Sequence, residues 1–289
     1  ILGILIKNGL VIEPRERIKE RLDIYIEDGV IKKVSPRIDD PHARIIDADG
    51  SWVISSVTDC HVHLRDPGFE YKETIESGLL AAVKGGVTRV LCMANTNPVN
   101  DNPSVLGYVL RKARNANLAK LYPICSVTKG MKGKELSPFL LLREEGAVAF
   151  SDDGYFVSDA LVMRRALEYI KTFKGIIISH CEIPELTRGG VVNEGSFSTR
   201  TGLPAIPPEA EVIAVYRDVT LAEYTGSRIH IAHVSLEKSL DIISSAKNRG
   251  VDVSCETCPH YFLLSDDGID PTDADFKVNP PIRSRDDME

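Results

Sequence analysis

The sequence predicts an α/β fold, a (β/α)8 TIM-like barrel that follows a small N-terminal β unit. From residue 57 onward, short apolar segments alternate with longer segments of helical character, which is typical of right-handed βαβ crossovers in a parallel sheet. Before residue 57, short alternating segments are broken by Asn8-Gly9 and Asp28-Gly29, dipeptides that favour tight hairpin turns. We therefore expect two domains, a small antiparallel β unit over residues 1–54 and a barrel over residues 55–289.

Seven strands and six helices are expected in the barrel. The strands are the apolar runs 57–63, 88–93, 121–127, 147–152, 175–180, 228–234 and 252–256. The helices are expected over 71–84, 104–117, 134–144, 159–171, 207–224 and 235–249, and several of them end at a Gly.

An eight-stranded barrel needs one more strand than these seven. The sequence stops at a charged stretch, residues 285–289, that is typical of the start of a helix. We therefore expect the barrel to be incomplete here and its eighth strand to lie beyond Glu289. The alternative is an open doubly wound sheet, which would favour a glycine-rich first βα turn, but residues 63–68 read His-Leu-Arg-Asp-Pro-Gly.

Composition excludes several classes of protein. With 43% hydrophobic and 27% charged residues, the 289-residue chain is typical of a globular protein. A net charge of -7 argues against a nucleic-acid partner. No apolar run approaches the roughly 18–20 residues of a membrane-spanning helix. The six Cys are irregularly spaced, which indicates reduced thiols, and we expect a cytoplasmic protein.

Four of the seven histidines fall where a barrel would bring them together. His61 and His63 are two apart on an expected strand, so their side chains leave the same face. His180 and His233 lie at the carboxyl ends of two later strands, and in a barrel such ends converge on one mouth. Imidazole is the commonest neutral metal ligand, so these four predict a metal site. The structural alternative for the His-x-His pair is that one side chain is hydrogen-bonded and the other is solvated.

A catalytic metal centre also favours an anionic ligand. Asp152 and Asp153 end another expected strand, and alternation allows only one of them to point inward. An Asp-Gly turn is the structural alternative for the same residues. Of the other histidines, we expect His42 and His230 to be structural, and His260 is left open between a supporting and a plain loop residue.

Six motifs stand in order on the expected elements. They are Asp59-Cys60-His61-Val62-His63-Leu64-Arg65-Asp66-Pro67-Gly68, Met93-Ala94-Asn95-Thr96-Asn97-Pro98, Phe150 to Gly154, His180-Cys181-Glu182, Ile231-Ala232-His233-Val234-Ser235 and Asn279-Pro280-Pro281-Ile282-Arg283. Over its whole length the chain resembles a type I dihydroorotase of the amidohydrolase superfamily. It departs from that pattern at Ser55-Ser56, where the family usually has Pro-Gly, and at Met93-Ala94-Asn95, where Met-Pro-Asn is more usual.

The resemblance implies roles for individual residues. It makes His61, His63, His180 and His233 ligands of one or two zinc ions, and Asp153 the carboxylate that stands where relatives use a carboxylated lysine. It makes Arg65 and Asn95 the groups that hold the substrate carboxylate, with Asn279 lining the ring. A guanidinium suits a carboxylate because it can donate two parallel hydrogen bonds. The alternative for Arg65 is a surface ion pair with Asp66.

The implied reaction is the reversible zinc-dependent closure of N-carbamoyl-L-aspartate to L-dihydroorotate in pyrimidine biosynthesis, with a metal-bound hydroxide attacking the ring amide in the hydrolytic direction. The family's general base is an Asp on strand eight, which we expect beyond Glu289, so the catalytic base is not assigned. The resemblance further implies a homo-oligomer, a β-sandwich completed by later residues, and association with aspartate carbamoyltransferase.

Two other functions remain as alternatives. One is a hydantoinase-like or allantoinase-like cyclic amidohydrolase, although those relatives generally carry the lysine that Asp153 replaces. The other is a non-catalytic barrel that serves only as a partner of aspartate carbamoyltransferase. Zinc content would separate that scaffold from an enzyme. We also expect residues 187–208, rich in Gly and Pro, to form a long mobile loop near the cavity.

Overall fold

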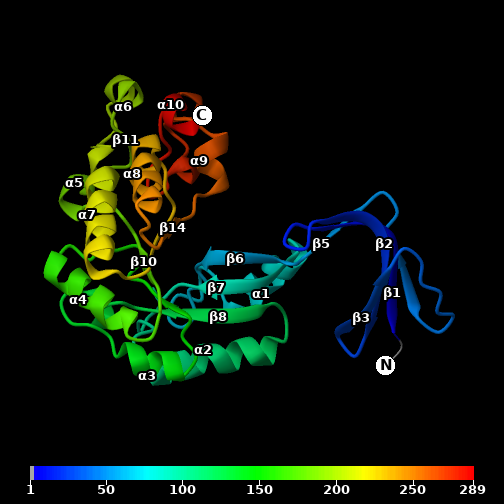
Figure 1. Ribbon diagram of the computed structural model, residues 1–289. Helices are drawn as coiled ribbons and strands as arrows, with labels where there is room; N and C mark the ends of the chain where they lie inside the picture. Colours follow the sequence, from blue (N-terminus) through cyan, green and yellow to red (C-terminus); the bar gives the residue numbers. More distant parts are fainter. Residues whose placement is uncertain (1–2) are drawn as a thin grey trace. The chain divides into compact units, whose positions relative to one another are not determined.

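The computed structural model describes residues 3–289, so Ile1 and Leu2 of the expected small unit lie outside the described part. The chain divides into two compact units, Ile1–Val57 and Thr58–Glu289. Each unit is built around its own sheet, and the two sheets can be followed in Figure 1.

The small unit is a five-stranded sheet. Its strands are β1 (Ile4–Glu13), β2 (Ile18–Glu27), β3 (Val30–Ser35), β4 (Arg44–Asp47) and β5 (Trp52–Ile54). β1 pairs antiparallel with β2, and β2 with β3, but β4 and β5 both run parallel to β1. The expectation of an antiparallel unit is therefore confirmed for β1, β2 and β3 and is wrong for β4 and β5. After β3 the chain returns to the start of β1, and the backbone N–H of Arg44 donates to the carbonyl of Gly3 at 2.7 Å. Because β4 starts beside the start of β1, the two strands run parallel.

Only one of the two expected hairpin turns forms. Asp28 and Gly29 join β2 to β3 with φ angles of 50° and 74°, which confirms a tight turn. Asn8 and Gly9 instead lie inside β1, where the pairing with β2 shifts register between Ile6 and Gly9. Asn8 has a φ of 64°, so the positive φ that the dipeptide favours is used for a bulge.

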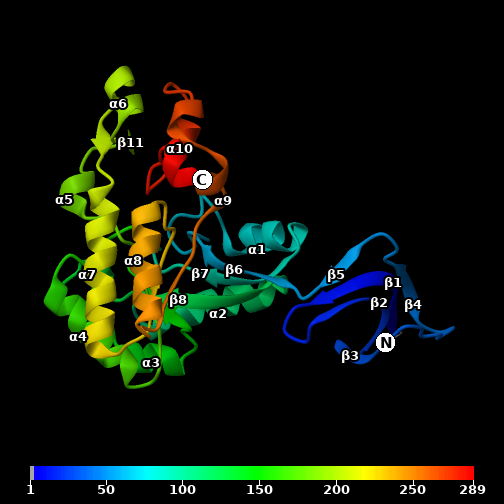
Figure 2. The ribbon, with the colours of Figure 1, turned by 45° about the horizontal axis from the view of Figure 1, so that its top comes forward.

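The larger unit contains a curled sheet of seven strands (Figures 1 and 2). They are β6 (Val57–Val62), β7 (Val87–Cys92), β8 (Lys120–Cys125), β9 (Ala149–Phe150), β10 (Ile177–Ser179), β13 (Ile229–Ile231) and β14 (Val253–Cys255). Their order in the sheet follows the chain, from β6 at one edge to β14 at the other. All seven expected strands are confirmed, although most are shorter than expected. Their pairings from β7 onward are parallel.

Helices follow the strands as expected. The six expected helices are α1 (Ile75–Lys84), α2 (Pro103–Ala116), α3 (Phe139–Glu144), α4 (Ala160–Lys171), α7 (Glu209–Thr225) and α8 (Glu237–Asn248). Short elements lie between them and near the C-terminus: α5 (Pro184–Thr187), β11 (Val192–Asn193), α6 (Ser196–Thr201), β12 (Ala205–Ile206), α9 (Pro259–Leu263), α10 (Arg285–Met288) and the 3₁₀ helices Lys129–Met131, Asp266–Gly268 and Ala274–Phe276. Within residues 3–289, no helix is both long and apolar enough to cross a bilayer.

The core holds the strands rigidly at both faces. Between the sheet and the helices, Phe139 of α3 packs on Phe150 of β9 with ring centroids 4.3 Å apart, and both side chains are buried. A second cluster brings together Met93, Ile124 and Ile178 from three different strand ends. Interiors packed in this way are rigid, so the polar residues that follow these strands start from fixed positions.

The segment 187–208, expected to form a long mobile loop from its Gly and Pro content, contains short regular elements. β11 and β12 pair within it in parallel, and α6 lies between them. Val192, Phe197 and Ile206 are buried. These three apolar side chains anchor the segment, an effect that a count of turn-forming residues does not capture.

Candidate metal centre

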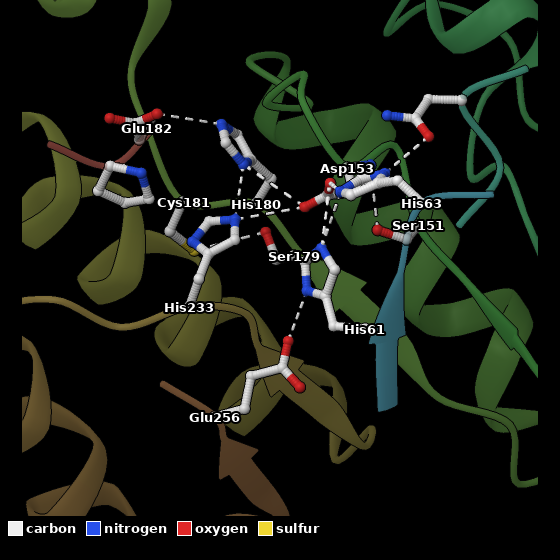
Figure 3. Close-up of polar contacts among 12 residues, drawn as sticks. His61, His63, Ser151, Asp153, Ser179, His180, Cys181, Glu182, His233 and Glu256 are labelled. Atoms are coloured by element: carbon white, nitrogen blue, oxygen red, sulfur yellow. Dashed lines mark hydrogen bonds and ion pairs between the residues drawn. The ribbon is translucent and has the colours of Figure 1, made fainter. Parts of the chain in front are cut away.

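Five side chains that the sequence analysis singled out converge at the carboxyl ends of four strands (Figure 3). His61 lies on β6 and His63 directly follows it, while Asp153, His180 and His233 follow β9, β10 and β13. Parallel strands present their carboxyl ends at one edge of a sheet, which brings residues from distant parts of the chain together.

The carboxylate of Asp153 divides its two oxygens between two pairs of imidazoles. Oδ2 lies 3.3 Å from Nε2 of His61 and 3.2 Å from Nε2 of His63. Oδ1 lies 3.3 Å from Nε2 of His233 and 3.6 Å from Nδ1 of His180. Two groups of ligand atoms could each hold a metal ion: His61, His63 and Asp153, and Asp153, His180 and His233. Asp153 belongs to both groups.

Asp152 points away from this cluster. It accepts hydrogen bonds from the backbone N–H of Thr128, at 3.0 Å, and from the Thr128 hydroxyl. Burial raises the pKa of Asp152 to about 6, and the bonds from Thr128 act in the opposite direction. Its carbonyl also accepts a bond from the N–H of Tyr155, so the expected turn forms as well. The turn and the alternation of the strand together direct Asp153 to the imidazoles.

Three of the four imidazoles are held from behind by an acceptor. Nδ1 of His61 lies 2.6 Å from Oε1 of Glu256, and Nδ1 of His63 lies 2.9 Å from Oδ1 of Asn95. Nε2 of His180 lies 3.2 Å from Oε2 of Glu182. For His233, Nδ1 is buried without a hydrogen-bond partner in the described residues.

Sequence reasoning assigned no role in the centre to Glu182 or Glu256. A signal was present, because Glu182 follows His180 by two residues and Glu256 ends the last expected strand. Both residues lie just after the carboxyl end of a strand, as His180 and His233 do.

The electrostatics of the cluster fit a divalent cation. Burial favours the neutral form of Asp153, but hydrogen bonds from the surrounding imidazoles hold its pKa well below the usual range. Burial disfavours the charged forms of His61 and His180, yet Asp153 and the outer glutamates raise their pKa values to about 10 and about 9. A buried anion among imidazole nitrogens is the donor set that divalent transition metals take in proteins. The residues present therefore fit such an ion.

The backbone is strained at His233 in the cluster and at Arg65 close to it. His233 has a φ of 37° and Arg65 a φ of 59°, in a region that L residues with side chains rarely adopt. Such conformations concentrate at functional sites, where the surrounding structure enforces them.

A cavity of about 660 Å³ opens over the cluster. Arg65, Asn95 and Asn279 line it together with the five proposed ligands. The alternative for Arg65, an ion pair with Asp66, is wrong. The Asp66 carboxylate is buried and instead accepts from Lys112 at 2.6 Å and from the Tyr108 hydroxyl at 3.0 Å.

The remaining histidines lie at the edge of the site or outside it. His42 is exposed in the small unit. His230 contacts the Ser254 hydroxyl at 2.8 Å through Nδ1 and lies 3.4 Å from Glu256 through Nε2. His260 lines the cavity. All six cysteines are free.

Sequence comparison identifies the family. A family model described as Dihydro-orotase-like matches residues 50–239. A dihydroorotase of Acetivibrio thermocellus is 49% identical over 285 residues, which cover 99% of this chain and 67% of that relative. A dihydroorotase of Syntrophotalea carbinolica is 50% identical over 288 residues, which cover 100% of this chain and 68% of the relative. The chain belongs to the dihydroorotase family. It spans about two-thirds of the length of these dihydroorotases.

Solved structures show which fold this chain adopts. The chain matches the L-hydantoinase (dihydropyrimidinase) from Arthrobacter aurescens with a TM-score of 0.84 at 22% identity, over 100% of this chain and 65% of that one. It matches a D-hydantoinase (dihydropyrimidinase) from Thermus sp. with a TM-score of 0.76 at 27% identity, over 99% and 64%. The expected barrel class is thereby confirmed for this dihydroorotase-family chain.

Proposed function

We propose that the cavity serves the dihydroorotase reaction, the reversible closure of N-carbamoyl-L-aspartate to L-dihydroorotate in pyrimidine biosynthesis. The observation that carries this proposal is the shared position of Asp153 between two pairs of imidazoles, in a cavity that Arg65 and Asn95 also line. The family membership of the chain supports the same reaction.

In this proposal, His61, His63, Asp153, His180 and His233 hold one or two divalent ions. A bound ion would polarise the amide carbonyl of the ring and lower the pKa of water. Asp153 would offset the positive charge of bound ions, because one of its oxygens faces each imidazole pair. We propose zinc as the metal, since zinc accepts both imidazole and carboxylate ligands.

Arg65 and Asn95 recognise the carboxylate of the substrate, and Asn279 contacts its ring. The guanidinium of Arg65 can donate two parallel hydrogen bonds to a carboxylate. The amide oxygen of Asn95 accepts from His63, so its NH2 group remains as the donor toward the substrate. None of the residues named here is assigned as the general base, so substrate binding is measured in place of turnover.

Metal content and substrate binding test this proposal together. The purified chain and its Asp153→Ala variant are compared by elemental analysis, and dihydroorotate binding to both proteins in the presence of zinc is measured by calorimetry. We expect the parent chain to retain metal and bind dihydroorotate, and the variant to lose both. A parent chain that purifies and remains without metal would instead support a non-catalytic partner of aspartate carbamoyltransferase.

Dihydrouracil provides the comparison with the hydantoinase-like or allantoinase-like alternative. It has the same ring as dihydroorotate but lacks the carboxylate. Equal affinity for the two compounds would contradict recognition through Arg65 and favour the alternative. A clear preference for dihydroorotate would support the proposed reaction.

We propose two domains, a small unit over residues 1–54 that forms one layer of a β-sandwich, and a barrel over residues 55–289. Several large apolar side chains of the small unit's sheet are exposed, including Ile31, Ile45, Trp52 and Ile54. A second layer of strands would cover them. We further propose, from the resemblance alone, a cytoplasmic homo-oligomer that associates with aspartate carbamoyltransferase. Analytical ultracentrifugation with and without the carbamoyltransferase tests the last two points.

A further inference from the structure

Glu256 lies directly behind His61 on the side away from Asp153 (Figure 3). Oε1 of Glu256 is 2.6 Å from Nδ1 of His61, while Nε2 of the same ring is 3.3 Å from Oδ2 of Asp153. The imidazole of His61 thus spans two carboxylates, one on each nitrogen. Only Nε2 faces the two other members of its ligand group, His63 and Asp153.

A neutral imidazole carries its proton on one nitrogen and can bind a metal only through the other. An acceptor on Nδ1 keeps the proton there and leaves the lone pair on Nε2. We propose that Glu256 is a positioning residue, whose carboxylate fixes the tautomer and ring orientation of His61 so that Nε2 is the ligand atom. This inference rests on the proposed metal centre.

The carboxylate of Glu256 is itself held in place. Its side chain is only 19% exposed, and its second oxygen, Oε2, lies 3.4 Å from Nε2 of His230. His230 is fixed in turn by the Ser254 hydroxyl, 2.8 Å from its Nδ1. Glu256 therefore has one oxygen at hydrogen-bond distance from His61, and its other oxygen lies near His230.

The contact also joins the two outer strands of the seven-stranded sheet. His61 lies on β6 and Glu256 follows β14, and these strands are at opposite ends of the strand order. The other proposed ligand pair, His180 and His233, comes from the adjacent strands β10 and β13, whose pairing already fixes their spacing. β6 and β14 do not pair with one another in the described residues, so the contact between His61 and Glu256 is made by side chains alone.

Glu182 makes it possible to test which pair of histidines depends on Glu256 for zinc binding. It occupies the equivalent place behind His180, with Oε2 3.2 Å from Nε2, and is 6% exposed. Loss of Glu256 should affect the group of His61 and His63, whereas loss of Glu182 should affect the group of His180 and His233. The two variants are thus controls for one another.

The experiment follows zinc binding at each histidine separately. Chain labelled with ¹⁵N-histidine is titrated with chelator-buffered Zn²⁺, and long-range ¹H–¹⁵N spectra report the tautomer and the titration midpoint of every imidazole. The parent chain is compared with Glu256→Ala, Glu256→Gln, Glu182→Ala and Glu223→Gln. Glu223 is an exposed residue of α7 that pairs with Arg249 and serves as the surface control.

In Glu256→Ala we expect the midpoints of His61 and His63 to move to roughly ten- to a hundredfold higher free Zn²⁺. The midpoints of His180 and His233 should move by less than about a third of that change. Glu256→Gln retains an acceptor oxygen and should recover part of the affinity. Thermal unfolding of the metal-free variants shows whether they are folded to the same extent as the parent.

The inference would be overturned if the zinc midpoints of His61 and His63 were unchanged in Glu256→Ala. It would also be overturned if the midpoints of all four histidines shifted equally and the metal-free variant unfolded at a lower temperature. A parent chain that binds no zinc, or an Asp153→Ala variant that binds it normally, would instead refute the metal centre itself. The two failures are therefore distinguishable.

Discussion

Arg283 and Glu211 form an ion pair in which each side chain is only 2% exposed, with Nη2 and Oε2 3.4 Å apart. The same guanidinium donates to the Ser235 hydroxyl at 2.9 Å and to Oδ1 of Asn193 at 2.9 Å. Arg283 thereby connects the segment after β13, α7 and β11 with the loop that carries Asn279. Removal of one partner of such a pair leaves a buried charge without compensation.

We expect Arg283→Met to lower the free energy of unfolding by about 3–5 kcal/mol, because Glu211 would remain buried without its partner. Urea denaturation measures the change. Arg285→Met is a matched control, since Arg285 is 59% exposed and pairs with Asp267 on the surface. That control should cost no more than about 1 kcal/mol. Similar losses in both variants would argue against the burial of Arg283.

Asp153→Asn and Asp152→Asn should differ sharply in metal binding. Asp153 contributes to both ligand groups, so Asp153→Asn should weaken metal binding at both. Loss of a hydrogen bond behind a ligand costs roughly ten- to a hundredfold in metal affinity, and loss of the ligand itself should cost more. Asp152 is occupied by Thr128, so its amide variant should keep the parent affinity. Competition with a chelating dye measures both. If Asp152→Asn loses metal and Asp153→Asn does not, the assignment of the two residues is reversed.

Arg65→Lys should weaken binding of dihydroorotate and leave binding of dihydrouracil unchanged. Lysine keeps the charge but cannot form the two parallel bonds of a guanidinium. Since hydrogen bonds to charged groups contribute about 1.5–3 kcal/mol, the loss of one predicts a roughly ten- to a hundredfold higher dissociation constant for dihydroorotate. Calorimetry of the zinc-loaded proteins measures both compounds. An equal loss for dihydrouracil would mean that Arg65 supports the shape of the cavity and does not recognise the carboxylate.

Lys112→Met should destabilise the chain in a way that depends on pH. Asp66 is fully buried, and both Lys112 and the Tyr108 hydroxyl face it. Hydrogen bonds to Asp66 and Tyr108 raise the pKa of Lys112. Because Lys112 is 40% exposed, we expect a loss of about 1–3 kcal/mol, less than for a fully buried pair.

The raised pKa gives the sign of this dependence. The stabilisation from Lys112 is fully present below the pKa of an unfolded lysine, about 10.4, and is lost as the pH rises through the higher folded value. The difference in unfolding free energy between the parent and Lys112→Met should therefore be constant from about pH 7 to 9 and shrink above about pH 10.4. A difference that grows with pH would contradict the pair.

The sequence predicted the fold and the grouping of the site residues correctly where a local pattern of residues is compatible with only one structure. Apolar runs predicted every strand of the larger sheet, and polar residues at the ends of those runs predicted the cluster around Asp153. Where one dipeptide or composition suits two structures, the prediction failed. Asn8 has the positive φ that a hairpin turn would use, but it lies inside β1, where that φ forms a bulge in the pairing with β2. In residues 187–208, burial of Phe197 overrides the many turn-forming residues.

The roles of Glu182 and Glu256 could not be read from local pattern. A glutamate at a strand end is compatible with a solvated side chain, and only the tertiary structure brings Glu256 within 2.6 Å of His61, 195 residues earlier in the chain. The split of the Asp153 oxygens between two histidine pairs is likewise a property of four converging strands. Spacing predicted which residues meet, but not which atom of each faces which partner.

The separation of 195 residues between His61 and Glu256 also bears on how the centre is assembled during synthesis. A ribosome releases the His-x-His strand long before it has made Glu256, so an emerging polypeptide has only two of the ligands and no acceptor behind the first. Domains fold as units as they are made, and a nascent chain of this kind cannot complete its centre until β14 has left the exit tunnel. Insertion of an ion into the proposed centre would therefore be a late event in biogenesis, and early capture of a metal by the His-x-His pair alone would be incomplete and weak.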